Sequence, residues 1–223
     1  MIVVTKTLVI IAHPDINNSS VQQFLMESTQ NLDNVTNYVL ADRIIEIKKE
    51  QDRLKDYDRI IFQFPMYWYS APYILKRWMD EVFQDTSNAT MLQGKEFGLV
   101  VSMGVSEDSF ASGKKEGYTL SELFRPFEAF AKKCKMTYLP IFSISLFPYL
   151  VEVEKKELLI KYQQYLTKVN DDRFKAKEDW FIEKLVMYNN NSRDELSAIL
   201  ATIEENRDEL DDLIHVVREM REE

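Results

Sequence analysis

The sequence predicts an α/β domain in which helices cover both faces of a doubly wound, five-stranded parallel sheet, followed by a C-terminal helical extension. Along residues 1–169, short apolar segments rich in β-branched side chains alternate with longer amphipathic segments, which is typical of this fold class. Residues 170–223 differ in charge, because they hold 16 acidic and 8 basic residues whereas residues 1–169 hold 21 and 20. We therefore expect a sheet domain over 1–169 and an acidic helical extension over 170–223.

Five segments have the composition of buried strands. They are residues 7–12, 35–40, 59–64, 97–103 and 137–143, the last interrupted by Pro140. Periodicity and start signals predict one helix from about residue 18 with an apolar stripe reaching Leu32, a second over 71–83 with Pro72 in its first turn, and a third over 120–133. Five strands that alternate with helices favour a flavodoxin-like sheet, in which ligands bind at the carboxyl ends of the strands.

Composition excludes several classes of protein. A single cysteine, Cys134, rules out an intramolecular disulfide and a multi-cysteine metal centre, and is expected to be buried rather than redox-active. Only two histidines are present, His13 and His215, so no metal site is expected. The net charge of −9 argues against a nucleic-acid partner. The longest uncharged runs, 60–75 and 136–151, contain prolines and are too short to span a membrane, so we expect a cytoplasmic protein without membrane insertion.

The loop after the first predicted strand has the features of an anion site. It begins at His13 and ends at Ser19 and Ser20, where a helix starts. A helix start presents unpaired N–H groups and the positive end of the helix dipole, and the serines add hydroxyl donors. The loop lacks the lysine and glycines that wrap a triphosphate, so a single phosphate or a pyrophosphate is the expected anion. The alternative is that Asn18 or Ser19 only caps the helix.

The loop after the third predicted strand is aromatic where a polar sequence is expected. Tyr67, Trp68 and Tyr69 follow Pro65 and Met66 at the edge where ligands bind. Large aromatic side chains at this edge suggest a flat, apolar ligand that lies against them. An interface with another subunit or helix is the alternative, because aromatic residues are also enriched at interfaces.

The loop after the fourth predicted strand carries Ser102, Met103, Gly104 and Val105. Gly104 allows a ligand to approach the backbone closely, and Ser102 offers a hydrogen-bond donor at the end of the strand. The alternative is an ordinary turn from strand to loop.

Several separated motifs occur in order along the chain. They are Ala12-His13-Pro14 with Ser19, then Pro65-Met66-Tyr67-Trp68-Tyr69-Ser70-Ala71-Pro72 with Trp78-Met79-Asp80, and then Gly117-Tyr118-Thr119-Leu120, Arg125-Pro126-Phe127 and Tyr138-Leu139-Pro140. Together they resemble the flavodoxin-like NAD(P)H:quinone oxidoreductases. Within that family the chain is similar to the bacterial flavoproteins that accompany glutathione-regulated potassium-efflux systems and to modulator-of-drug-activity proteins. The likeness spans roughly residues 7–169.

The resemblance implies a flavin cofactor, FMN with FAD as the alternative, which takes hydride from NAD(P)H and passes it to a quinone or similar electrophile. Because both substrates would use one face in turn, ping-pong kinetics are expected. The resemblance also implies a homodimer and a possible transporter partner. Tyr118 would lie at the rim of the substrate pocket and donate a proton or hydrogen bond to the quinone oxygen. No histidine lies between His13 and His215, so Tyr118 or water would supply that proton.

The same resemblance implies a set of cofactor-binding residues in all three loops. Ser19 would hold the flavin phosphate with His13 beside it, and Val21 and Gln22 would close over the ribityl region. The residues implied to surround the isoalloxazine ring are Pro65, Met66, Tyr67 and Trp68 on one side, and Ser102, Met103, Gly104 and Val105 at its pyrimidine edge.

The acidic extension carries a heptad pattern, with His215 on the opposite face. Positions 3 and 4 residues apart hold Leu196, Ile199, Ile203, Asn206, Leu210, Leu213, Val217 and Met220. We expect a helix that docks on a partner subunit or packs on its own domain, anchored by another helix around Trp180 and Phe181. Besides the oxidoreductase, two other functions are open: a regulatory flavoprotein that binds a transporter or other partner through this helix, and an electron carrier that does not react with NAD(P)H.

Overall fold

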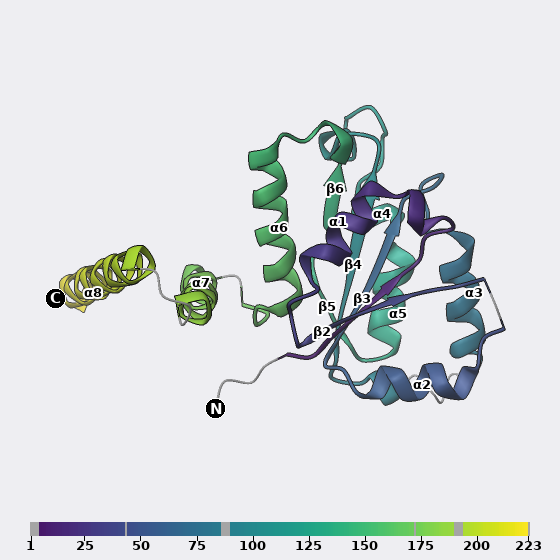
Figure 1. Cartoon of the computed structure of the whole chain (residues 1–223), viewed down its shortest axis with the longest axis horizontal. Helices are drawn as coiled ribbons and strands as arrows, with labels where there is room; N and C mark the ends of the chain where they lie inside the picture. The colour runs from purple at the N-terminus through teal and green to yellow at the C-terminus, as the bar shows by residue number, and fades with distance from the viewer. Residues whose placement is uncertain (1–4, 43, 86–89, 172, 190–193, 223) are drawn as a thin grey trace. The chain divides into compact units, whose positions relative to one another are not determined.

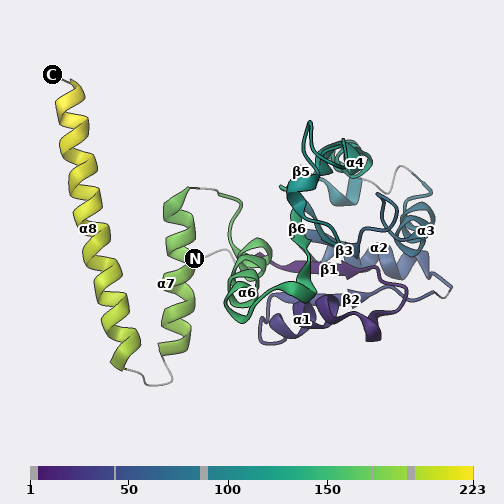
Figure 2. The ribbon, with the colours of Figure 1, turned by 90° about the horizontal axis from the view of Figure 1, so that it is seen from above.

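The computed structural model describes residues 5–42, 44–85, 90–171, 173–189 and 194–222. The chain folds into two compact units, Met1–Asn170 and Asp171–Glu223. The first unit is an α/β domain, as predicted. In the second unit, α7 (Phe174–Asn189) and α8 (Asp194–Glu222) lie side by side as an antiparallel helical hairpin (Figure 2).

A parallel sheet with the order β2-β1-β3-β4-β5 forms the centre of the first unit, and β6 also pairs with β4. The central strands are mostly apolar because helices cover both of their faces. The strands are β1 (Thr7–Ile11), β2 (Val35–Val39), β3 (Arg59–Pro65), β4 (Glu96–Met103), β5 (Thr137–Tyr138) and β6 (Phe142–Ser145).

Helices lie on both faces of this sheet (Figure 1). One face is covered by α1 and α6, and the other by α2, α3 and α5. The α-helices of the first unit are α1 (Ser20–Ser28), α2 (Ile47–Lys55), α3 (Tyr73–Val82), α4 (Leu120–Leu123), α5 (Arg125–Lys133) and α6 (Glu152–Thr167). Short 3-10 helices are η1 (Ile16–Asn18), η3 (Glu107–Ser109) and η4 (Phe147–Tyr149).

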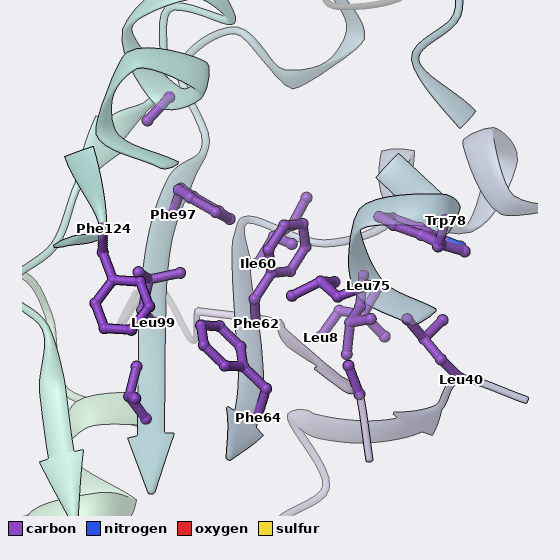
Figure 3. Packing of buried hydrophobic residues seen from close by; sticks show 14 of the residues in the cluster. Leu8, Leu40, Ile60, Phe62, Phe64, Leu75, Trp78, Phe97, Leu99 and Phe124 are labelled. Atoms are coloured by element: carbon purple, nitrogen blue, oxygen red, sulfur yellow. The ribbon is translucent and has the colours of Figure 1, made fainter. Parts of the chain in front are cut away.

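The larger core is aromatic and lies between the sheet and α3 and α5 (Figure 3). The ring of Phe62 on β3 meets Trp78 of α3 at 5.8 Å and Phe97 of β4 at 4.8 Å, both edge to face. These geometries are favourable beyond the area that they bury. The core therefore fixes α3 against the sheet, and with it the end of the loop that precedes α3.

Two predicted elements are divided in the structure. The helix expected over 120–133 is α4 and α5, because the ring of Pro126 in the first turn of α5 prevents one continuous helix. The fifth strand is β5 and β6, which both pair with β4 on either side of Pro140 and end at Ser145 rather than 143.

Other boundaries differ as well. The first helix ends at Ser28, so Leu32 lies in the turn that follows and not on the helical stripe. Pro72 is the N-cap of α3 rather than a residue of its first turn. Neither α2 nor α6 was predicted, since each is rich in charged residues and α6 buries only Tyr162 and Leu166 fully.

Within the described residues, no helix combines the length and the apolar character needed to cross a membrane.

The packing of α6 on the sheet depends on the absence of a side chain at Gly98 in β4. A Cβ built there would overlap the hydroxyl of Tyr165 and approach Ile61 Cδ1 to 2.9 Å. The Tyr165 hydroxyl is held in place by hydrogen bonds to the carbonyls of Pro140, at 2.9 Å, and Leu99.

We expect Gly98→Ala to lower the free energy of unfolding by about 1–3 kcal/mol, because the added methyl group displaces Tyr165. Urea denaturation measures the change. Gly104→Ala is the control, since no atom lies within 4 Å of its added Cβ. Equal stability of the Gly98 variant and the original chain would show that α6 can shift without cost.

Candidate functional site

The three predicted loops follow β1, β3 and β4, which are neighbours in the sheet. Two hydrogen bonds beyond the strands keep their ends in register: the Ala12 N–H donates to the Gln63 carbonyl and the Met66 N–H to the Ser102 carbonyl, both at 2.8 Å. The chain order reverses between β1 and β3, since β2 lies on one side of β1 and β3 on the other. The loops therefore meet at the position where ligands bind in doubly wound sheets.

The first loop ends in a capped helix start with unused donors. Ser19 is the N-cap of α1, and its Oγ accepts the Gln22 N–H at 3.4 Å. Among the described residues, the N–H groups of Ser20 and Val21 have no hydrogen-bond partner. The Ser19 hydroxyl proton is also available, because the cap uses only its oxygen as an acceptor. Both interpretations of Ser19 are thus compatible: it caps the helix and can still donate to an anion.

His13 stands at the start of this loop in a defined orientation. Its Nδ1 accepts the N–H of Asp15 at 3.0 Å, so the neutral ring carries its proton on Nε2. Burial lowers the pKa of His13 from its ordinary value, although the nearby Asp15 carboxylate opposes that change. At neutral pH the ring is therefore an uncharged donor through Nε2. The centroids of the His13 and Tyr67 rings lie 6.4 Å apart, in an edge-on arrangement.

The second loop is a tight and strained turn. Tyr67 and Ser70 exchange two backbone hydrogen bonds, at 2.9 and 3.0 Å. Between them, Trp68 and Tyr69 have φ values of 47° and 62°. This left-handed conformation costs a non-glycine residue roughly 1–2 kcal/mol. The Trp68 side chain is 93% exposed, so no packing in the chain itself explains why an aromatic residue occupies this position. Strain that the fold maintains around an exposed ring indicates a binding role.

The segment between η3 and α4 is tied to the strained turn. Tyr69 donates its hydroxyl to Glu116 Oε2 at 2.9 Å, and this carboxylate raises the pKa of Tyr69. Tyr118 follows two residues later and is 58% exposed. Its backbone is fixed on the other side by the Thr119 capping box of α4, in which Thr119 N–H donates to Glu122 at 2.7 Å. Those hydrogen bonds lower the pKa of Glu122.

The third loop combines a buried serine with backbone N–H groups that are not hydrogen-bonded. Ser102 and Met103 are buried at the end of β4, whereas Val105 is exposed. Gly104 has no atom within 4 Å of the position of a Cβ. The described residues offer no hydrogen-bond partner to the N–H groups of Gly104 and Val105. This loop can therefore donate to acceptor atoms at the edge of a ligand.

A chain of buried hydrogen bonds lies beneath the three loops. Tyr162 of α6 donates to Gln63 Oε1 at 2.6 Å, and Gln63 Nε2 donates to Gln22 Oε1 at 2.6 Å. Gln22 Nε2 then donates to Ser102 Oγ at 3.4 Å. Tyr162, Gln63 and Gln22 are fully buried. The Gln22 side chain thus faces into the protein and links the first loop to the third.

Two members of this chain were not predicted from the sequence. Gln63 is a polar residue within the apolar strand 60–64, which is a usable signal that a buried partner exists. Tyr162 gave no signal, because its helix was not predicted and its partner is 99 residues away.

The remaining chemistry-bearing residues lie outside the site. Cys134 is buried, and burial raises the pKa of its thiol to about 11, so it is protonated at neutral pH. The described part of the chain holds no cluster of three His, Cys, Asp or Glu residues that could bind a metal ion. What the site offers is a set of donors for an anion, exposed aromatic rings and open backbone N–H groups, which together suit a flat ligand with a phosphate group.

The first unit is similar to known proteins in sequence. The sequence profile of a family described as having a flavodoxin-like fold matches residues 5–168. An NAD(P)H oxidoreductase of Bacillus subtilis, YrkL, itself described as uncharacterized, is 40% identical over 146 residues, which are 62% of this chain and 84% of YrkL. The potassium-efflux ancillary protein KefG of Enterobacter sp. (strain 638) is 34% identical over 142 residues, 60% of this chain and 78% of KefG.

Two solved structures are similar as well. An NADPH-quinone reductase from P. pentosaceus superposes with a TM-score of 0.71 at 47% identity, covering 74% of this chain and 99% of that one. General stress protein 14 from Treponema denticola, solved in complex with FMN, superposes with a TM-score of 0.63 at 31% identity, covering 72% of this chain and 95% of that one.

Relief of the strain at Trp68 should stabilise the free protein. We expect Trp68→Gly to raise the free energy of unfolding by ~0.5–1 kcal/mol, since glycine adopts positive φ without a steric penalty. Trp68→Val is the matched contrast and should destabilise, because a β-branched residue is poorly accommodated there. Urea denaturation without added ligand measures both. A destabilised glycine variant would mean that the indole makes stabilising contacts.

The buried hydrogen-bond chain should contribute to stability through Tyr162. Tyr162→Phe leaves Gln63 Oε1 buried without its donor, and we expect the free energy of unfolding to fall by about 1–3 kcal/mol. Tyr149→Phe is the control, because the Tyr149 side chain is 80% exposed. If the two variants were equally stable, the hydroxyl of Tyr162 would not be needed to hold the site together.

Proposed function

The chain belongs to the family of proteins with a flavodoxin-like fold, and on that basis we propose that it is an FMN-dependent oxidoreductase that reduces a quinone or similar electrophile with NAD(P)H. One observation carries the proposal: unused donors at the start of α1, a strained aromatic turn and an open loop lie together at the ends of β1, β3 and β4. The FMN complex of general stress protein 14 and the names of the NADPH-quinone reductase and of YrkL support it.

The first loop suits the phosphate of FMN. In our proposal the Ser19 hydroxyl and the N–H groups of Ser20 and Val21 bind the phosphate, and His13 donates to it through Nε2. Gln22 would not contact the phosphate; its buried amide would position the start of α1 relative to Ser102. The FMN complex of general stress protein 14 favours FMN over FAD.

The other two loops suit the isoalloxazine ring. Pro65, Met66, Tyr67 and Trp68 would line the ring, and Ser102 and Met103 would stand at its pyrimidine edge with Gly104 and Val105. The N–H groups of Gly104 and Val105 would stabilise negative charge at that edge. The strained turn holds Trp68 exposed before any ligand arrives, so ordering this loop costs little on binding.

When bound, FMN supplies the hydride-transfer chemistry itself. The protein's part is to orient the two substrates and to exclude competing reactions. We infer that NAD(P)H and the acceptor occupy the same face in turn, which gives ping-pong kinetics. Tyr118, held between the Tyr69–Glu116 hydrogen bond and the Thr119 capping box, would donate a hydrogen bond or proton to the acceptor oxygen.

Flavin binding and reduction test this proposal directly. The purified chain should bind FMN tightly, more tightly than FAD, and anaerobic NADPH or NADH should bleach the flavin absorbance near 450 nm (approximate, from cofactor chemistry). Ser19→Ala should weaken FMN binding by roughly tenfold, the loss of one charge-assisted hydrogen bond, yet leave riboflavin binding unchanged because riboflavin has no phosphate. Ser28→Ala, at the other end of α1, is the matched control.

His13 provides an independent readout of where the phosphate binds. The chain has only two histidines, so both can be followed by NMR, and His215 on α8 serves as the internal reference. The pKa of His13 begins below its ordinary value and should rise when FMN binds, because the phosphate dianion stabilises the imidazolium form. No binding of either flavin would contradict the proposal, and binding without bleaching would reduce it to a flavin carrier.

A second candidate is a regulatory flavoprotein that binds a transporter or other partner. The similarity to KefG, described as ancillary to a potassium-efflux system, and the exposed apolar residues of α8 favour it. Removal of residues 194–223 separates the two: if NAD(P)H oxidation is retained, α8 has a docking role rather than a catalytic one.

A further inference from the structure

The buried hydrogen-bond chain beneath the three loops has one polarity. The hydroxyl of Tyr162 donates to Gln63 Oε1 and Gln63 Nε2 donates to Gln22 Oε1, both at 2.6 Å. Gln22 Nε2 then donates to Ser102 Oγ at 3.4 Å. Each amide thus accepts from the member before it and donates to the member after it. The bonds therefore point in one direction, from α6 toward the end of β4, and reinforce one another.

Tyr162 fixes this polarity. Two amides in series form the opposite chain equally well when both are turned over, and Ser102 would then donate to Gln22. That reverse chain would leave the Tyr162 hydroxyl proton without a partner, because among the described residues this hydroxyl has no acceptor other than Gln63 Oε1. Tyr162 is fully buried and burial raises its pKa, so at neutral pH the proton is neither solvated nor released. An unsatisfied buried donor is costly, and only the observed direction avoids it.

Ser102 is the last member of the chain and has a proton left to donate. Its Oγ accepts from Gln22, and no residue in the described part of the chain accepts the Ser102 hydroxyl. Ser102 is 7% exposed at the end of β4, beside the unused N–H groups of Gly104 and Val105. A hydroxyl whose oxygen already accepts a hydrogen bond is a stronger donor. Ser102 is therefore a strengthened donor that is available to a ligand at this edge of the sheet.

The next step rests on the proposed function. We propose that Tyr162 is a positioning residue which, through the two glutamine amides, sets the Ser102 hydroxyl to donate to the pyrimidine edge of bound FMN and so raises the reduction potential of the flavin. This edge carries acceptor atoms, and it gains negative charge when the ring is reduced. A preorganised donor stabilises that charge, so the reduced form gains more than the oxidised form.

The reduction potential of FMN bound to the full chain tests the proposal. Ser102→Ala should lower the affinity for reduced relative to oxidised FMN by roughly tenfold, the loss of one hydrogen bond to a charged group. Tenfold corresponds to about 30 mV in a two-electron couple. Tyr162→Phe should give a smaller fall of roughly threefold in the same direction, because the amides are then free to turn over and Ser102 to donate to Gln22.

Tyr165→Phe is the matched control. It removes another buried hydroxyl from the same helix, one that donates to two backbone carbonyls outside the chain, and it should leave the potential unchanged. The double variant Tyr162→Phe, Ser102→Ala should have the potential of Ser102→Ala alone, because Tyr162 acts only through Ser102.

The flavin-free protein gives a second readout by NMR. The side-chain amide signals of Gln22, which is not bonded to Tyr162, should shift in Tyr162→Phe and stay in place in Tyr165→Phe. Gln22→Met breaks the chain beside Ser102 with little change in volume, and it should lower the potential as well. A displaced α1 would instead change the affinity for both redox forms alike and leave the potential where it was.

The outcomes separate this inference from the function on which it rests. Equal potentials in Tyr162→Phe and Tyr165→Phe, or additive effects in the double variant, would overturn the inference while FMN binding and reduction stand. If Tyr162→Phe does not fold, an unchanged potential in Gln22→Met overturns it in the same way. Absence of FMN binding by the unaltered chain would overturn the proposed function, and this inference with it.

Discussion

The buried hydrogen-bond chain from Tyr162 through Gln63 and Gln22 to Ser102 is the interaction on which the arrangement of the site depends. It joins α6, β3, α1 and β4 at the level where the strands end. Buried amide groups are costly unless each is satisfied, so only one arrangement of these four elements is acceptable. The start of α1 and the end of β4 are therefore held in a fixed relation before any ligand binds.

The strained turn of Trp68 and Tyr69 is maintained from both sides of the loop. The aromatic core anchors α3 behind it, and the Tyr69–Glu116 hydrogen bond ties it to the segment that leads to Tyr118. These contacts hold the exposed rings of Trp68 and Tyr69 in place before a ligand binds, so the loop does not have to become ordered on binding. In the second unit, the apolar residues of α8 after Arg207 are exposed.

Much of the fold follows from local patterns. The central strands were recognisable because a parallel sheet covered on both faces demands continuous apolar runs, as in β1, β3 and β4. Ser19 was recognisable as a helix start, and the aromatic residues 67–69 stood out where a polar loop was expected. The split at Pro126 and the division of the fifth strand at Pro140 are local effects too, but their outcome depends on how each half packs on β4 and the core.

The sequence by itself determined which loops are candidates for the site, because residue type and order are enough to find serines at a helix start, aromatic residues after a strand and a heptad pattern in an acidic tail. The tertiary structure decided how those residues are arranged and what they contact. Gln22 is a buried link between two loops, Trp68 and Tyr69 adopt the left-handed conformation, and the apolar residues of α8 after Arg207 are exposed. Each of these depends on contacts between residues far apart in the chain, such as the 80 residues that separate Gln22 from Ser102, and no local pattern encodes them.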